Sequence, residues 1–341
     1  MGRRLLAALL VLGLWLGAGA ALARPAATIT DLGTLGGPNS FATDINRFGR
    51  VTGYSDTASG ETHAFMWRRG HMTDIGTLGG GSSVGRAIND SGYVVGRSRT
   101  SRGEEYAFIW RNAPMQSLGS LGGNYSDAFD ITNGERIVGE SRTRAGELHA
   151  FMWHQGAMTD LGTLGGAYSG ARAINDNREI AGMSQTAAGD IHAVLWRDGG
   201  ITDLGTLGGA YSEATGINNA GQVVGFSTTA AGHIHAFVWQ AGAMTDLGTL
   251  PPDPDDDSGF ILDSRARAIS PAGVVAGGSD EFYKSSRAVI WQNGQIVSLG
   301  ALPGGQNSQA GGINGAGQVV GASDLGESGV DPSHAVLWTL P

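Results

Sequence analysis

The sequence contains no cysteine, a single lysine (Lys284) and few charged residues of either sign. The absence of cysteine excludes disulfide bonds, thiolate metal sites and a cysteine nucleophile. Charged residues make up 16% of the 341 residues, and the formal net charge is −9 at pH 7. A protein that binds nucleic acid needs a basic surface, so the composition argues against nucleic acid as a partner.

Proline is also scarce, at 10 residues, although glycine is abundant at 58. The glycines do not follow a Gly-X-Y period, which excludes a collagen-like chain. Hydrophobic residues make up 41% of the chain, and this fraction together with so few charges indicates a folded protein rather than a disordered one.

Beyond residue 23, no apolar run approaches the ~20 residues that a membrane-spanning helix needs. Residues 1–23 follow the order of a signal peptide: a positive start at Arg3 and Arg4, an apolar stretch from Leu5 to Leu16, and the small-residue cleavage site Ala21-Leu22-Ala23. We expect export, with the mature chain periplasmic or extracellular and not attached to a membrane. An uncleaved membrane anchor is the alternative.

One tryptophan recurs at nearly constant spacing through the rest of the chain. The spacing is 43 residues four times, then 52 and 47. A serine and a glycine recur in register with it. The tryptophans are Trp67, Trp110, Trp153, Trp196, Trp239, Trp291 and Trp338; the serines are Ser40, Ser83, Ser126, Ser169, Ser212, Ser264 and Ser308; the glycines are Gly53, Gly96, Gly139, Gly182, Gly225, Gly277 and Gly321. The chain is therefore one supersecondary unit repeated seven times.

Each unit contains four short segments typical of β-strands, which in the first unit are residues 40–45, 51–55, 63–67 and 72–76. No window shows a helical period. Four strands in about 43 residues are typical of a propeller blade. We therefore predict an all-β fold, a seven-bladed β-propeller of four-stranded blades, as a single domain over residues 24–341. The units lie near residues 31–73, 74–116, 117–159, 160–202, 203–245, 246–297 and 298–341.

The two ends of the repeat array complement each other. The last unit stops after its third strand, while residues 27–33 form a strand-like segment that precedes the first complete unit. We predict that this N-terminal strand completes the last blade. Such pairing closes the ring and removes an exposed sheet edge.

The repeated strings resemble those of the extracellular HAF-repeat family of bacteria. The resemblance rests on HAFMW at residues 63–67 and 149–153, HAFVW at 235–239, and the recurring DLGTLGG, and it covers residues 27–341. Units two and six depart from it, with Tyr106 and Arg287 in place of the histidine, and units four and seven read HAVLW. The resemblance implies an exported β-repeat protein and supplies no catalytic residues.

Five histidines share one column of the repeat: His63, His149, His192, His235 and His334. A metal site needs two or three ligands that converge, whereas one histidine per blade keeps the side chains apart. We therefore expect a structural hydrogen-bonding role for this column. The tryptophan column is expected to pack between neighbouring blades.

Candidate ligand-binding residues lie near the connections TLGGxxS between units. Three tyrosines directly precede the column serine on successive units, and three arginines recur a few residues later. These residues are Tyr125, Tyr168, Tyr211, Arg86, Arg172 and Arg267. Aromatic rings at a concave polar mouth suit stacking on sugars or peptides. The alternative is that the tyrosines only pack between loops.

The sixth unit carries an acidic insertion with Asp253, Asp255 and Asp257. Alternating aspartates are similar to a calcium loop, but the glycine comes one position late and the twelfth position has no acid. We expect a solvated loop without a cofactor, with weak calcium binding as the alternative.

These observations predict a non-catalytic binding or scaffold propeller, a monomer whose partner is an extracellular carbohydrate or protein. A scaffold would use the variable loops near residues 56–62, 99–105 and 142–148. The alternative is a polysaccharide-active hydrolase or lyase with its site near the divergent sixth blade. Acids outside the repeated columns include Asp127, Glu213, Asp263 and Glu281, without an obvious partner, and Tyr283 and Lys284 lie nearby.

Overall fold

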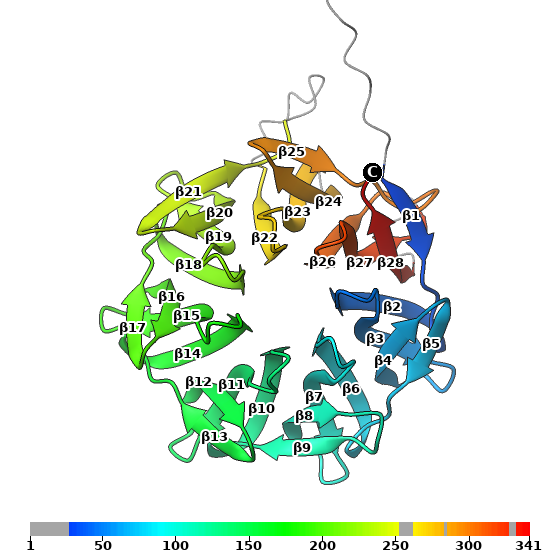
Figure 1. Cartoon of the computed structure of the whole chain (residues 1–341), viewed down its shortest axis with the longest axis horizontal. Helices are drawn as coiled ribbons and strands as arrows, with labels where there is room; N and C mark the ends of the chain where they lie inside the picture. The colour runs from blue at the N-terminus through cyan, green and yellow to red at the C-terminus, as the bar shows by residue number, and fades with distance from the viewer. Residues whose placement is uncertain (1–26, 252–261, 283–284, 327–331) are drawn as a thin grey trace, which may run out of the picture.

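A computed structural model describes residues 27–251, 262–282, 285–326 and 332–341. These residues form 28 strands, arranged as seven four-stranded antiparallel blades around a central axis (Figure 1). Among them, no helix is long and apolar enough to cross a membrane. The predicted all-β propeller is confirmed.

Within each blade the strands run in chain order from the axis to the rim. The first four blades are β2 (Gly36–Ile45), β3 (Val51–Thr57), β4 (Thr62–Arg68), β5 (His71–Asp74); β6 (Gly79–Ile88), β7 (Val94–Thr100), β8 (Glu105–Trp110), β9 (Gln116–Gly119); β10 (Gly122–Ile131), β11 (Ile137–Thr143), β12 (Leu148–His154), β13 (Ala157–Asp160); β14 (Gly165–Ile174), β15 (Ile180–Thr186), β16 (Ile191–Arg197), β17 (Gly200–Asp203). The other three are β18 (Gly208–Ile217), β19 (Val223–Thr229), β20 (Ile234–Gln240), β21 (Ala243–Gly248); β22 (Ser264–Ile269), β23 (Val275–Phe282), β24 (Ser285–Gln292), β25 (Gln295–Ser298); β26 (Ser308–Ile313), β27 (Gln318–Asp324), β28 (Ser333–Thr339), with β1 (Thr28–Asp31) outermost.

The N-terminal strand closes the ring, as predicted. β1 pairs antiparallel with β28, with Thr28 opposite Thr339 and Asp31 opposite Val336 (Figure 1, dark blue beside red). Just beyond β1, the Leu32 amide donates a 2.9 Å hydrogen bond to the Ala335 carbonyl. The seventh blade is thus built from both ends of the repeat array.

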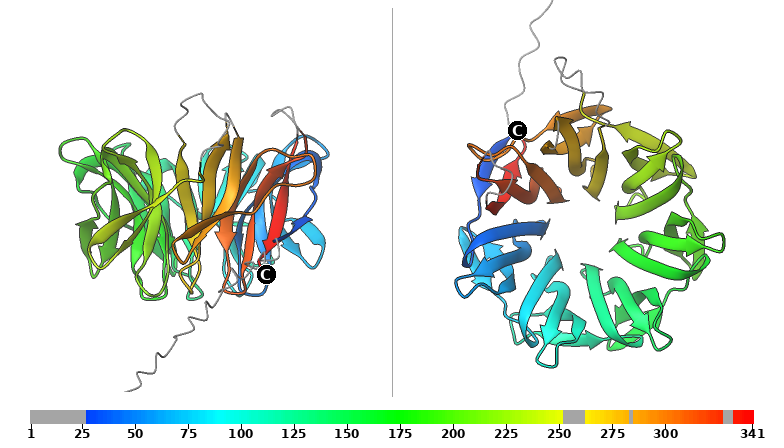
Figure 2. Two further views of the ribbon diagram at one scale, coloured as in Figure 1. Left: turned by 90° about the horizontal axis from the view of Figure 1, so that it is seen from above. Right: turned by 180° about the vertical axis from the view of Figure 1, so that it is seen from behind.

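The ring has two distinct faces. In each blade, the turn after the inner strand lies on one face, and the loop after the second strand lies on the opposite face. We call the side that carries the turn at residues 46–50 and its counterparts the turn face. The side that carries the loop at residues 57–62 and the TLGG connections is the mouth face. β28 ends on the turn face, where the C-terminus is marked in Figure 2.

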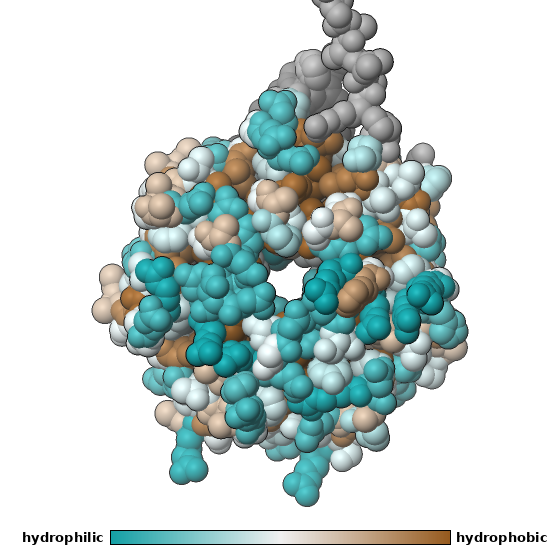
Figure 3. Space-filling model, in the orientation of Figure 1, coloured by the Kyte–Doolittle hydropathy of each residue, from teal (hydrophilic) through white to brown (hydrophobic). Residues whose placement is uncertain are grey.

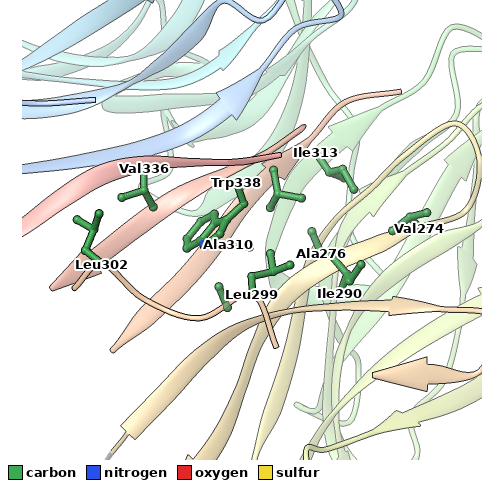
Figure 4. Packing of buried hydrophobic residues seen from close by; sticks show 11 residues of the cluster. Val274, Ala276, Ile290, Leu299, Leu302, Ala310, Ile313, Val336 and Trp338 are labelled. Atoms are coloured by element: carbon green, nitrogen blue, oxygen red, sulfur yellow. The ribbon is translucent and has the colours of Figure 1, made fainter. Parts of the chain in front are cut away.

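The hydrophobic core is divided into seven clusters, one at each interface between neighbouring blades. Figure 4 shows the cluster between blades six and seven, where Trp338 packs among Leu299, Leu302 and Ala310. The cluster between blades seven and one contains Leu32, which follows β1 directly. Each blade therefore buries its apolar surface only against its two neighbours.

The tryptophan column belongs to these interfaces, as expected, but not every member is fully buried. Trp338 has no exposed surface, and Trp110, Trp196 and Trp291 are at most 9% exposed. Trp153, like Trp67 and Trp239, is half-buried.

The column serines connect each inner strand to the preceding blade. Ser83 Oγ donates a 2.6 Å hydrogen bond to the Gly76 carbonyl and accepts one of 2.8 Å from the Ala64 amide. The same pair of contacts recurs at all seven serines. Because both groups satisfied by the serine are backbone groups, the residue is required in every repeat.

An asparagine on the turn face makes a second inter-blade contact. The Asn46 side-chain amide donates to the Asn89 carbonyl of the next blade at 2.9 Å, and Asn314 donates back to the Asn46 carbonyl at 3.1 Å. Five blades share this bond, while Thr132 and Ser270 occupy the position in the other two.

The column histidines form hydrogen bonds at the outer edge of the blades, as expected. His63 Nδ1 lies 2.7 Å from the Asp74 carboxylate, which also accepts the Gly76 amide. Equivalent His–Asp contacts of 2.7–2.8 Å occur in the other blades that carry the histidine. One of them joins His334 of β28 to Asp31 of β1 and so adds a side-chain contact to the ring closure.

The column glycine is required by close approach of two strands. A Cβ atom at Gly53 would lie 1.9 Å from the Phe41 carbonyl oxygen, and the other six column glycines would come within 2.1 Å of the equivalent carbonyl. No side chain fits there, so every repeat keeps glycine at this position for a structural reason.

Deleting residues 24–33 removes β1 and Leu32, exposing the edge of β28 and one of the seven core clusters. We expect the melting temperature to fall by several degrees, measured by circular dichroism. A chain that starts at residue 27 keeps β1 and serves as the control. If both chains melt alike, closure by β1 is wrong.

Replacing Trp338 by alanine leaves a large cavity in a fully buried cluster and is expected to lower the free energy of unfolding by roughly 3–5 kcal/mol. Replacing the half-buried Trp153 by alanine should lower the free energy of unfolding by clearly less. Urea denaturation of the two variants measures the difference, and equal losses would contradict the packing described.

Candidate functional site

Three columns of the repeat vary from blade to blade although the positions around them are nearly constant. They are the residue after the column serine, the residue two positions further on, and the residue after the column glycine. In blade order these read Phe41, Val84, Asp127, Gly170, Glu213, Arg265, Gln309; Thr43, Arg86, Phe129, Arg172, Thr215, Arg267, Gly311; and Tyr54, Arg97, Glu140, Met183, Phe226, Gly278, Ala322. The contacts that hold the blades together therefore do not determine which residues occupy these three columns.

Members of these columns line one cavity in the mouth half of the central channel. Its volume is about 460 Å³, and all seven blades contribute to its wall. The lining includes Phe41, Tyr54, Phe129 and three arginines. The channel opens at the centre of the ring, and polar side chains surround this opening on the turn face, which is the face drawn in Figure 3.

A row of two arginines and a phenylalanine forms one wall of the cavity. Arg86, Phe129 and Arg172 occupy the same position on blades two, three and four. The two guanidinium carbons lie 5.2 and 4.2 Å from the centre of the Phe129 ring. Cation–π attraction therefore holds the three side chains against one another.

Carboxylates behind this wall hold both arginines in place. Arg86 contacts Asp127 of the next blade at 3.0 Å, while Arg172 contacts Glu140 at 2.9 Å and Glu213 at 2.8 Å. Burial raises the pKa of Asp127, and the neighbouring Arg86 opposes that shift. Asp127 and Glu213 thus have specific partners, which corrects the impression from sequence that these acids are unpartnered. The reason is that the partners lie on different blades.

Arg267 differs from the other two arginines of its column. It is exposed to the channel and makes no hydrogen bond or ion pair with any residue in the described part of the chain. The surrounding walls displace part of its water, which lowers the pKa of Arg267, and the charge of Glu213 opposes that shift. The side chain remains a cation, because even a shifted guanidinium keeps its proton at neutral pH.

The wall beside Arg267 is hollowed by small residues. Gly311 stands next to it on blade seven, and Ala310 and Ala322 continue the surface toward blade one. There the rings of Phe41 and Tyr54 stack with centroids 5.0 Å apart. We call this small-residue surface with its two aromatic rings the recess.

Tyr125, Tyr168 and Tyr211, predicted to lie near loops, belong to the inner strands β10, β14 and β18. Each of these strands begins three residues before its tyrosine. Tyr168 Oη donates to Glu140 at 3.3 Å, and Tyr211 Oη donates to Glu213 at 2.8 Å. Tyr125 Oη also points to Glu140, at 3.5 Å. The tyrosines therefore support the carboxylates, and their hydroxyls are already used.

The structure thus brings Arg86, Arg172 and Arg267 together at one cavity, whereas none of the three tyrosines is among the residues that line it. The column serines, considered as polar partners for a ligand, are buried and bonded within the frame. Sequence reasoning missed the aromatic residues of the wall and recess, together with Glu140 and Gln309. Variation between repeats, column by column, is the signal that would have found them.

Other candidates fall elsewhere. Asp253, Asp255 and Asp257 lie outside the described residues, as do Tyr283 and Lys284, and the calcium alternative stays a prediction. Asp263 accepts the Ile234 amide at 3.0 Å and contacts Arg265. Among residues 27–251, 262–282, 285–326 and 332–341, no three His, Asp or Glu side chains could hold a metal ion.

No family model and no curated protein match the chain. Solved structures with the same fold do. The propeller domain of the Trilobed protease from Pyrococcus furiosus, described as having an open velcro topology, is 10% identical with a TM-score of 0.55; the alignment covers 88% of this chain and 95% of that one. A puromycin-hydrolysing peptidase from Mycobacterium tuberculosis is 12% identical with a TM-score of 0.57, over 91% of this chain and 50% of that one.

An acylaminoacyl peptidase from Pyrococcus horikoshii is 11% identical with a TM-score of 0.51, over 88% of this chain and 51% of that one. The chain therefore spans about half the length of the two peptidases. At these identities the likeness shows the β-propeller fold alone, and the ring here is closed by β1.

Replacing Arg172 by alanine leaves Glu140 and Glu213 without their cation, so we expect a loss of roughly 3 kcal/mol in the free energy of unfolding. Arg267→Ala removes a side chain that has no ion pair and is expected to cost little. Tyr168→Phe removes only one hydroxyl contact and should cost about 1 kcal/mol. Urea denaturation ranks the three variants, and a loss at Arg267 equal to that at Arg172 would contradict the assignment.

Proposed function

We propose that this chain is an exported, non-catalytic binding propeller that holds an extracellular carbohydrate at the mouth of its central channel. The observation that carries the proposal is the pattern of variation within the repeat. Serine, asparagine, glycine and histidine columns recur because they hold the blades together, whereas the positions facing the channel vary between blades. The varied positions form one cavity with cations, aromatic rings and amide groups.

The chemistry of the cavity suits a sugar. Its volume falls within the range of small-molecule sites, and rings such as Tyr54 offer a flat face to the C–H side of a pyranose, while Gln309 and the arginines can bond hydroxyl groups. A folded protein partner would need a broad surface of about 800 Å², which a channel cannot present.

The acids around the cavity support binding rather than glycoside hydrolysis. A hydrolase needs two carboxyl groups that flank the scissile bond, one of them free to protonate the leaving group. Glu140 and Glu213 are both held by Arg172 and by tyrosine hydroxyls. Asp127 is 1% exposed and lies behind Arg86. Glu213 lines the cavity, but Arg172 and the Tyr211 hydroxyl occupy its two oxygens, and neither Glu140 nor Asp127 is among the residues that line it.

Export is supported by the N-terminal sequence, because residues 1–23 have the order of a signal peptide. The HAF strings point in the same direction, since the family they resemble is extracellular. The ligand would accordingly be a sugar of the periplasm, the cell surface or the surroundings.

The test is a glycan array probed with the mature protein, followed by calorimetric titration of the ligands found. Tyr54→Ala removes one ring of the recess and should weaken binding several-fold, since a stacking contact contributes about 1 kcal/mol. Phe48→Ala removes an exposed ring from the turn face and is the matched control. Binding to protein partners only, through the loops near residues 56–62, would overturn the proposal in favour of a scaffold.

A further inference from the structure

We infer that the ligand carries a carboxylate and that Arg267 binds it, with the sugar ring lying in the recess of blades seven and one. This inference rests on the proposed function and deepens it. The inference concerns the arc of the cavity formed by blades six, seven and one. The chemistry of this arc differs from that of the arc formed by blades two to four.

The repeat itself shows what is unusual at Arg267. In two other blades, the arginine of this column pairs with an acid that follows the column serine of the next blade: Arg86 with Asp127, and Arg172 with Glu213. The equivalent partner of Arg267 on blade seven is Gln309. A neutral amide therefore stands where the register elsewhere places a carboxylate, and within the described residues Arg267 forms no ion pair, although the charge of Glu213 acts on it from farther away.

Both side chains are available to a ligand. Arg267 and Gln309 are exposed and both line the cavity, and neither side chain makes a hydrogen bond or ion pair within the described part of the chain. A guanidinium can bond both oxygens of a carboxylate, and a primary amide can both donate to and accept from a sugar hydroxyl.

Space beside Arg267 allows an anion to approach. The next residue of its column, Gly311 on blade seven, lines the same cavity and packs against blade one, where a Cβ atom would lie 2.9 Å from the Ala42 carbonyl oxygen. The preceding one is Thr215, whose hydroxyl donates to the Ala266 carbonyl at 3.0 Å. On the opposite arc, Phe129 and the two paired arginines fill the corresponding space. The cavity that Arg267 lines therefore continues over Gly311 into the recess.

The charge balance of the whole mouth supports an anionic ligand. Each of the other four arginines near the channel lies within 4 Å of a carboxylate: Arg86, Arg97, Arg172 and Arg265. The chain as a whole carries a net charge of −9. An unpaired cation in a concave site of an acidic protein is a local attraction for anions, because low-dielectric walls focus its field.

Gln309→Glu is the decisive variant. It gives Arg267 the partner that Arg86 and Arg172 already have, so the fold is kept and the melting temperature should be unchanged or higher. The same change neutralises the proposed anion site. Arg267→Gln removes the cation directly, and Arg47→Gln, an exposed arginine on the turn face, is the matched control.

The probes are disaccharides that contain glucuronic or galacturonic acid, their methyl esters, and the neutral glucose and galactose counterparts, titrated by calorimetry. We expect the unmodified protein to bind at least one acid at least tenfold more tightly than its ester and its neutral counterpart. Gln309→Glu and Arg267→Gln should lose that tenfold preference, and Arg47→Gln should keep it. The preference should also shrink as sodium chloride is raised.

The outcomes separate the two proposals. If sugars bind but acid, ester and neutral forms bind alike, or if Gln309→Glu keeps the preference while remaining folded, the carboxylate site is wrong and carbohydrate binding stands. If the array and the titrations show no sugar binding, both proposals fail. Binding to peptides rich in glutamate with no binding to any sugar would likewise overturn both proposals, because the ligand would then be an anionic peptide.

Discussion

The structure depends on burial between blades, because no blade has a core of its own. Each apolar cluster is shared by two neighbours, and the last of the seven exists only when β1 has joined β28. Hydrophobic burial at one interface is therefore coupled to burial around the whole ring. The column serines add directed hydrogen bonds across each of the same interfaces, which fix the angle between neighbouring blades.

This constraint divides the repeat into two kinds of position. A residue that contacts the neighbouring blade cannot change without disturbing an interface, as Gly53 and Ser83 illustrate through a carbonyl contact and a pair of backbone hydrogen bonds. A residue that faces the channel is not fixed by these backbone contacts and can differ between blades, even where its side chain pairs with the next blade, as at Arg86 and Arg172. Arg86, Phe129 and Arg172 show the result, because arginine and phenylalanine alternate at the same position of the repeat and together form one wall.

The repeat made the fold predictable from the sequence. Seven copies of one pattern averaged out the uncertainty of any single strand, and the surplus strand at the N-terminus matched the missing one at the C-terminus. The three arginines could be grouped from the sequence because they recur in a column, and the structure places them at one cavity. The role of the tyrosines could not be predicted, since nothing in the local sequence shows that Tyr168 and Tyr211 turn their hydroxyls toward acids. Contacts such as Arg172 with Glu140 join different blades and become visible only when the ring is assembled.

The central claim is that the closed ring presents its ligand site where the repeat varies. A crystal structure of the mature protein soaked with an acidic sugar from the array tests it directly. We predict density for the sugar within the channel mouth, with its carboxylate against Arg267 and its ring beside Phe41 and Tyr54. Density at the outer loops of the mouth face, with an empty channel, would contradict the account.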